Sequence, residues 1–230
     1  MSNETLPLGA PLPDWVPPVR PARERLTGRT CRLVPLDAAL HADALFDANA
    51  ADVAGRMWTY LPYGPFATRA DYRAWVVAGA VSADPLFFAI VDQATGRPVG
   101  VSAYLRIDPA NGVIEIGHLA YSPLLQRTTA ATEAMYLMIR RVFDLGYRRC
   151  EWKCNSLNAP SRAAALRLGF TPEGTFRQAM VVKGRSRDTD WFSIIDTEWP
   201  ARRAEFERWL APDNFDADGR QRAPLRMPSL

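Results

Sequence analysis

Hydrophobic and polar positions change their period several times along this chain, and each change marks a new element. Short apolar runs rich in β-branched and aromatic residues predict strands at about 30–36, 86–91, 99–107, 113–121, 149–155, 174–182 and 191–198. Apolar residues at helical spacing predict helices that follow Asp37, Thr68 and Asn158 and that span 131–145 and 201–210. Asp, Thr and Asn are typical N-cap residues because their side chains accept hydrogen bonds from the first backbone amides of a helix.

The connections between these elements indicate how a sheet is built from them. Ala94–Arg97 and Asn111–Gly112 are turn sequences typical of antiparallel hairpins, whereas the helix at 131–145 lies between two strands, as in a β-α-β crossover. We therefore expect a mixed α/β (α+β) fold with one central, mostly antiparallel sheet flanked by helices. Residues 1–28 carry six prolines and predict an extended arm. We expect part of this arm to dock on the domain through Trp15, because an indole side chain is rarely left fully exposed.

Composition and charge narrow the class of function. The 230 residues are 48% hydrophobic and 23% charged, which is typical of a globular chain with one large core. A net charge of +3, with acids and bases interleaved, does not favour a nucleic-acid partner, and no apolar run is long enough to cross a membrane. The three cysteines lack metal-ligand spacing, so we expect buried thiols, no metal and a cytoplasmic location. The N-terminus does not resemble a secretory signal.

The segment Gln126–Thr132, with the sequence QRTTAAT, is the most informative of the chain. It joins a predicted strand to a predicted helix. A small-residue loop that opens into a helix presents unpaired backbone N–H groups at the positive end of the helix dipole, which suits phosphates. From these residues alone, an ordinary connection that binds nothing is the alternative interpretation.

The order of the elements and the residues of this loop resemble the GNAT superfamily of acyl-CoA-dependent N-acyltransferases. Residues 126–131 are similar to the family's [Gln/Arg]-x-x-Gly-x-[Gly/Ala] motif, with Thr129 in place of the glycine, and Pro123 precedes them at the family's spacing. The resemblance covers about residues 29–200 as a single GNAT-like domain. The arm (1–28) and a C-terminal helix and tail (201–230) lie outside the resemblance.

Two further segments resemble the Rim-type branch of this superfamily, whose best-known members acetylate the N-termini of ribosomal proteins. They are Ala131-Thr-Glu-Ala134 and Asn158-x-x-Ser161 followed by Leu168-Gly-Phe170. The resemblance implies a sheet that is splayed between the fourth and fifth strands, and acetyl-CoA as cosubstrate. It also implies a set of cofactor-binding residues: Leu119, Ala120, Tyr121, Gln126, Arg127, Thr128, Thr129, Ala130, Ala131, Thr132 and Asn158.

Thr129 departs from the family motif at a position where glycine allows positive φ. Threonine is poorly suited to that conformation. Either the loop avoids it or the affinity for the cofactor is reduced.

The resemblance also indicates catalytic candidates. Ala165 occupies the position of a tyrosine that many GNAT enzymes use as the acid, so the Rim-type serine, Ser161, is expected to protonate the leaving thiolate. A first-turn serine that only satisfies backbone amides is the alternative. His118 and Glu115 are the candidates for the base, and as residues three apart on a strand they are expected on opposite faces. Asp190 or a water chain are the further alternatives.

On the acceptor side we expect the loop after the first helix, with Trp58, Tyr60 and Tyr63, and the charged loop from Lys183 to Asp190. The resulting hypothesis is an acetyl-CoA-dependent N-acetyltransferase that acts on a primary amine by direct attack in a ternary complex. A degenerate GNAT domain that binds coenzyme A as a sensor or assembly module is the alternative. The acceptor, a small molecule or a protein N-terminus, is left open, as is a homodimer.

Overall fold

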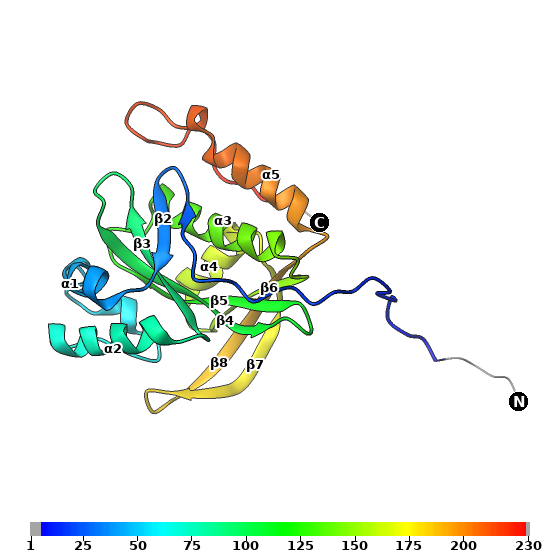
Figure 1. Cartoon of the computed structure of the whole chain (residues 1–230), viewed down its shortest axis with the longest axis horizontal. Coiled ribbons are helices and arrows are strands. Elements are labelled where there is room, and N and C mark those ends of the chain that lie inside the picture. The colour runs from blue at the N-terminus through cyan, green and yellow to red at the C-terminus, as the bar shows by residue number, and fades with distance from the viewer. Residues whose placement is uncertain (1–5, 229–230) are drawn as a thin grey trace, which may run out of the picture.

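The computed structural model describes residues 6–228 and shows one eight-stranded sheet flanked by helices (Figure 1). The strands follow the spatial order β1-β2-β3-β4-β5-β6-β8-β7, and every neighbouring pair is antiparallel except β5 and β6. The strands are β1 (Leu26–Thr27), β2 (Cys31–Pro35), β3 (Leu86–Asp92), β4 (Pro98–Asp108), β5 (Val113–Tyr121), β6 (Arg149–Asn155), β7 (Thr171–Val182) and β8 (Arg185–Ile195). The predicted fold class, a mixed and mostly antiparallel sheet, is confirmed.

The helices cover both faces of the sheet. They are α1 (Ala38–Asn49), α2 (Arg69–Val81), α3 (Thr129–Asp144), α4 (Ala159–Arg167) and α5 (Trp199–Leu210), with short 3-10 turns η1 (Arg56–Trp58) and η2 (Pro212–Asn214). One core cluster joins α3, α4 and α5 to the sheet, and a second joins α1, α2 and η1 to the opposite face. The sheet therefore has an α3 face and an α1–α2 face, and a strand presents alternate residues to each.

The three predicted N-caps are confirmed by hydrogen bonds. The side chains of Asp37, Thr68 and Asn158 accept from the backbone amides three residues later, at the starts of α1, α2 and α4. Helix α3 begins at Thr129, two residues earlier than its apolar spacing predicts, because the hydroxyl of Thr128 caps it by accepting from the amide of Ala131.

The prediction of a loop from Lys183 to Asp190 is wrong, because most of this segment belongs to a strand. Lys183 and Gly184, with φ of 51° and 71°, form a two-residue hairpin turn, and β8 begins directly after it at Arg185. The polar run up to Asp190 is typical of a loop in sequence, but here it pairs with β7 at the edge of the sheet. An edge hairpin needs few apolar residues because it extends beyond the core.

The two ends of the chain lie against the domain. The arm crosses the β4–β5 turn, where the indole N–H of Trp15 donates to the carbonyl of Ala110 (3.2 Å) and the ring packs on Gly112. The C-terminal tail returns past α5, with Leu225 buried in the core. The docking expected from Trp15 is confirmed. No helix between residues 6 and 228 is long and apolar enough to cross a membrane.

Candidate active site

A gap opens in the sheet where β5 and β6 separate. These parallel strands pair through only three residues on each side, Val113–Glu115 of β5 and Arg149–Glu151 of β6. From Ile116 to Tyr121 the edge of β5 that faces β6 has no strand partner in the described chain, so its backbone groups are free to bind another chain or ligand. This is the splay between the fourth and fifth predicted strands.

The loop after β5 places several backbone amides together. Those of Arg127, Thr129 and Ala130 have no hydrogen-bond acceptor within residues 6–228, and the last two belong to the first turn of α3. The positive φ of the loop falls on Arg127 (61°), whereas Thr129 lies inside the helix. Thr129 therefore occupies a position that does not require glycine. The loop avoids the conformation that threonine disfavours.

The other residues predicted to bind the cofactor surround these amides. The side-chain amide of Gln126 donates to the carbonyl of Tyr121 (2.7 Å), which closes the end of the free strand edge. Thr132 is buried, and its hydroxyl accepts from the guanidinium of Arg167 on α4 (2.8 Å), a residue that the sequence analysis does not single out. Leu119 and Ala120 lie on opposite faces of β5, packed into the two core clusters.

Ser161 lies in the first turn of α4, with its hydroxyl held in a fixed position. The indole N–H of Trp152 donates to Ser161 Oγ (3.0 Å), and Asn158 accepts from the Ser161 amide. The thiol of Cys154 is adjacent. Burial raises the pKa of this thiol, and the neighbouring Ser161 hydroxyl offsets only part of the increase. Because Trp152 donates, the Ser161 hydroxyl must direct its own proton elsewhere.

A β-bulge in β5 displaces His118 from the regular alternation. The register with β4 shifts between Val101–Ala120 and Ala103–Gly117, and His118 has a positive φ of 52°. Its ring stacks on Tyr63 (5.6 Å between centroids), with Nδ1 3.2 Å from the tyrosine hydroxyl. Burial, and then the charge of Arg106, lower the pKa of His118 to about 4, so the ring is neutral at pH 7.

Glu115 and His118 therefore share the α1–α2 face, not the opposite faces that strand alternation predicts. Glu115 alternates with Ile114 and Ile116, which belong to the core on the α3 face, and His118 packs on Tyr63 and Phe87. The extra residue of the bulge accounts for the difference, since it returns the chain to the same face one residue late.

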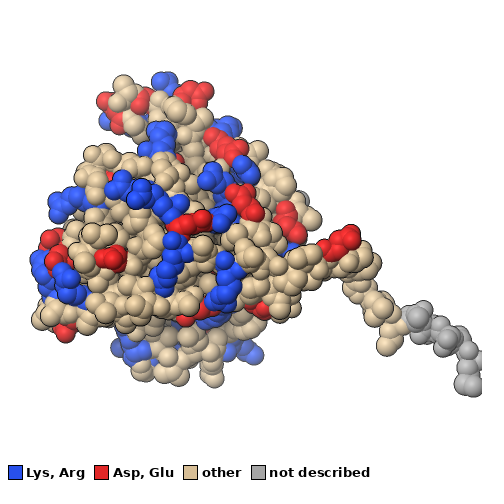
Figure 2. All heavy atoms as spheres, viewed as in Figure 1, with Lys and Arg blue, Asp and Glu red and all other residues tan. Residues whose placement is uncertain are grey.

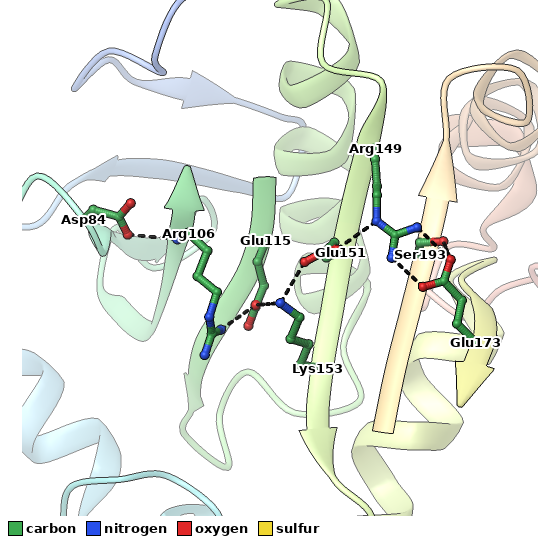
Figure 3. Close-up of polar contacts among 8 residues, drawn as sticks. All are labelled: Asp84, Arg106, Glu115, Arg149, Glu151, Lys153, Glu173 and Ser193. Carbon is green, nitrogen blue, oxygen red and sulfur yellow. Dashed lines mark hydrogen bonds and ion pairs between the residues drawn. The ribbon is translucent and has the colours of Figure 1, made fainter. Parts of the chain in front are cut away.

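Glu115 belongs to a network of ion pairs that crosses the sheet (Figure 3). Its Oε2 lies 2.5 Å from Arg106 Nη1 and 3.0 Å from Lys153 Nζ, and Lys153 also contacts Glu151 (2.8 Å). Arg149 continues the network from Glu151 toward Glu173. With one oxygen already shared by two cations, Glu115 is well placed to neutralise buried charge.

Sequence reasoning did not find this network, although β6 carries a signal for it. Arg149, Glu151 and Lys153 alternate with Cys150, Trp152 and Cys154, so one face of the strand is charged and the other apolar. That alternation places charges opposite Glu115 once the parallel pairing with β5 is known.

The aromatic loop and the β7–β8 hairpin meet on the α1–α2 face. Trp58 is buried among aromatic rings and belongs to the core, whereas its carbonyl accepts from Lys183 Nζ (2.8 Å). The hydroxyl of Tyr60 donates to the carbonyl of Leu157, before α4 (3.0 Å). These contacts hold the loop across the end of the gap. Asp190 is buried in β8 and pairs with Arg162 (2.8 Å).

Tyr121 points away from this gap. It packs with the core on the α3 face, where its hydroxyl is buried without a hydrogen-bond partner in residues 6–228. Burial, and then the neighbouring Cys31, raise its pKa well above the ordinary value.

Comparison with known proteins assigns this arrangement to a family. The profile of the acetyltransferase (GNAT) domain matches residues 31–171, and the chain belongs to this family. The predicted resemblance and the predicted class of enzyme, an N-acetyltransferase, are thereby confirmed.

Several individual proteins are similar to the chain. A GCN5-related N-acetyltransferase from Brucella melitensis is 52% identical, with a TM-score of 0.91 over 93% of this chain and 97% of that protein. The N-acetyltransferase p20 of Bacillus licheniformis is 29% identical over 112 residues, which cover 49% of this chain and 63% of that protein. The chain thus matches less than two thirds of the length of p20.

Two more distant structures share the fold. The ribosomal L7/L12 α-N-protein acetyltransferase RimL is 23% identical with a TM-score of 0.65, over 78% of this chain and 98% of its own. The microcin C7 self-immunity acetyltransferase MccE has the same identity and TM-score, over 73% and 93%, and was crystallised with acetyl-CoA and AMP. RimL, a member of the predicted Rim-type branch, therefore shares the fold of this chain, and MccE, which shares it too, was crystallised with the predicted cosubstrate.

Proposed function

We propose that this chain transfers an acetyl group from acetyl-CoA to a primary amine by direct attack in a ternary complex. The observation that carries the proposal is the gap between β5 and β6, which has a free backbone edge on one side and unpartnered amides at its end. The bound cosubstrate supplies an activated acetyl group. Everything else that the reaction needs is proximity, proton transfer and stabilisation of charge.

The donor side fits the chemistry of coenzyme A. The amides of Arg127, Thr129 and Ala130 can donate to a pyrophosphate, and the start of α3 adds the favourable end of a helix dipole. The unpaired edge of β5 from Ile116 to Tyr121 can pair with the amides of the pantetheine arm. Its amides at Leu119–Tyr121 remain the candidates for stabilising negative charge on the carbonyl oxygen.

The proton transfers are assigned to the two faces of the sheet. Ser161, on the α3 face, donates its proton to the leaving sulfur; the hydrogen bond from Trp152 uses one lone pair of Oγ and leaves the hydroxyl hydrogen available. His118, on the α1–α2 face, is neutral, and in the tautomer whose Nδ1–H donates to the Tyr63 hydroxyl its Nε2 can accept a hydrogen bond from the acceptor amine. Glu115 serves this site through the charge balance of Arg106 and Lys153.

Calorimetry with coenzyme A tests the donor site. Coenzyme A should bind, whereas pantetheine, which lacks the pyrophosphate, should bind at least tenfold more weakly. Thr129→Gly should keep the affinity within about threefold, because Thr129 already has helical geometry, and Thr129→Trp should abolish the difference between the two ligands by blocking the amides.

Equal affinity of the wild-type chain for pantetheine and coenzyme A would contradict this placement. Release of the thiol from acetyl-CoA with a panel of primary amines then tests transfer. Tight binding of coenzyme A without acetylation of any amine would instead favour a non-catalytic domain that senses the cofactor.

A further inference from the structure

Arg187 is a half-buried arginine that lacks an acidic partner. Its Nε donates to Thr189 Oγ1 (3.2 Å), and no carboxylate oxygen between residues 6 and 228 lies within 4.0 Å of its guanidinium. Burial lowers its pKa, since a charged group loses hydration there. By contrast, Arg149 of β6 and Arg162 of α4 each contact a carboxylate. An unpaired, partly desolvated cation is costly, and a bound anion would offset that cost.

The strand geometry places Arg187 on the α1–α2 face. In β8 it alternates with Phe192 and Ile194, which belong to the core on the other face, and it shares its face with Trp191. Trp191 is paired with Lys153 of β6, whose ammonium lies 3.6 Å from the centre of the indole ring. Lys153 also contacts Glu115 in the ion-pair network of Figure 3, so Arg187 shares its face of the sheet with that network.

The carboxylates on this face are already engaged. Glu115 contacts Arg106 and Lys153, and Glu151 contacts Lys153 and Arg149. Lys183, at the tip of the hairpin, contacts only a carbonyl through its ammonium among the residues described. Basic side chains are also visible on the lobe that this hairpin forms, at the bottom of Figure 2. The face therefore has uncompensated positive charge, which favours a negatively charged group of a ligand.

We propose that Arg187 binds an anionic group of the acetyl acceptor, so that the acceptor is a small amine that also carries a carboxylate or a phosphate. The inference rests on the proposed function, because it takes the α1–α2 face as the acceptor side. A guanidinium suits either group, since its planar N–H donors match the oxygens of both in bidentate fashion. The acceptor amine would reach the gap beside His118, on the same face as Arg187.

Matched pairs of acceptors test this specificity. One set pairs each proteinogenic L-amino acid with its carboxamide, and the other pairs O-phosphoethanolamine with ethanolamine. Thiol release from acetyl-CoA gives kcat and KM for the wild type, Arg187→Met, Arg187→Lys and the control Arg220→Met. Arg220 lies in the exposed tail and pairs with Asp218, so its substitution changes the net charge equally at a remote position.

For one set, the wild type should prefer the anionic member by at least tenfold in kcat/KM. Arg187→Met should raise KM for that member by about 10- to 100-fold and leave the neutral member unchanged, because only the charged contact is lost. Arg187→Lys should recover part of the loss, and Arg220→Met should behave as the wild type. The set that shows the effect identifies a carboxylate or a phosphate.

Equal use of both members of every pair, or an equal loss for both in Arg187→Met, would overturn the inference. A second measurement does not depend on turnover: the N-acetylated members are titrated calorimetrically into the chain saturated with coenzyme A. Binding of an anionic product that Arg187→Met abolishes would support the inference even if no amine were acetylated, which would contradict the proposed catalysis. Absence of any Arg187-dependent binding or turnover overturns it.

Discussion

At the scale of single residues, the hydroxyl of Ser161 accepts a hydrogen bond through its oxygen and keeps its hydrogen available to donate. The indole N–H of Trp152 donates to Ser161 Oγ, and the side chain of Asn158 accepts from the Ser161 backbone amide. The neighbouring Ala165 has no polar side-chain group and is buried. We propose that Ser161 is the proton donor for the leaving thiolate in addition to being a first-turn residue of α4. One side chain can hold both roles.

Ser161→Ala separates them. General acid catalysis contributes about 10²–10⁴-fold, so kcat should fall by this factor while the KM for acetyl-CoA stays within about threefold. Ser161→Thr keeps a hydroxyl and should retain more activity. Steady-state kinetics of both variants gives the answer, with thermal unfolding as a control for the lost bond to Trp152. A change in KM alone would make Ser161 a positioning residue, and unchanged kinetics would place the acid elsewhere.

His118 predicts a dependence of stability on pH. Its pKa is about 4 in the folded chain and about 6.5 when unfolded, so the unfolded chain binds the proton more tightly. The free energy of unfolding should therefore be unaffected above pH 7 and should fall as the pH drops from about 6.5 through 4. His118→Asn removes the titration and keeps a residue that tolerates positive φ.

Urea unfolding at a series of pH values compares the two chains. The wild type should lose more stability than His118→Asn over this interval, by up to a few kcal/mol, since one pKa unit corresponds to about 1.4 kcal/mol. Parallel curves for the two chains would show that His118 is not held neutral by its surroundings.

At the scale of elements, strand periodicity predicted most of the sheet but not its irregularities. The strand over 149–155 is confirmed to the residue, because its charged and apolar positions alternate without interruption. The bulge at His118 and the start of β8 at Arg185 could not be predicted from that pattern, since each depends on pairing with a neighbouring strand. The loop residues 126–132 were found through a local motif. The neighbours of Arg187 and Lys153 could not be predicted, because they lie on strands that are distant in sequence.

Helix α3 is fixed to the sheet edge by one buried carboxylate. Glu133 accepts from the amides of Arg29 (2.7 Å), Thr30 (2.6 Å) and Cys31 (3.1 Å), which form the β1–β2 turn. Gly28 belongs to the same turn, and a Cβ there would lie 2.5 Å from Glu133 Cδ. The glutamate of the Ala-Thr-Glu-Ala segment therefore has a structural role beside the cofactor loop.

Glu133→Gln should lower the free energy of unfolding by about 1–3 kcal/mol, because an amide nitrogen would face backbone donors where an acceptor is required. Urea denaturation measures this, with Glu24→Gln as a control, since Glu24 forms an exposed pair with Arg141 and should matter by less than about 1 kcal/mol. Equal effects of the two substitutions on the free energy of unfolding would mean that the buried contacts of Glu133 stabilise the fold no more than an exposed ion pair does.

At the scale of the whole molecule, the docked part of the arm around Trp15 and the loop 126–132 lie at opposite ends of β5. Trp15 packs on Gly112, just before the strand begins, and Arg148 lies over its ring. The cofactor loop follows the other end, after Tyr121. Nine residues of extended chain separate the two ends by about 30 Å. We therefore expect the interactions of Trp15 to stabilise the fold without reaching the gap.

Trp15→Ala tests this separation of stability from function. Loss of the packed indole and its hydrogen bond to Ala110 should lower the free energy of unfolding by about 1–3 kcal/mol, a typical value for a partly buried aromatic residue. The affinity for coenzyme A should remain unchanged, because no contact links the arm to the amides before α3 in the described structure. Leu8→Ala is the matched control, since Leu8 is 91% exposed and should not contribute. Weaker binding of coenzyme A by Trp15→Ala, measured calorimetrically below its unfolding temperature, would show that the arm and the site are coupled.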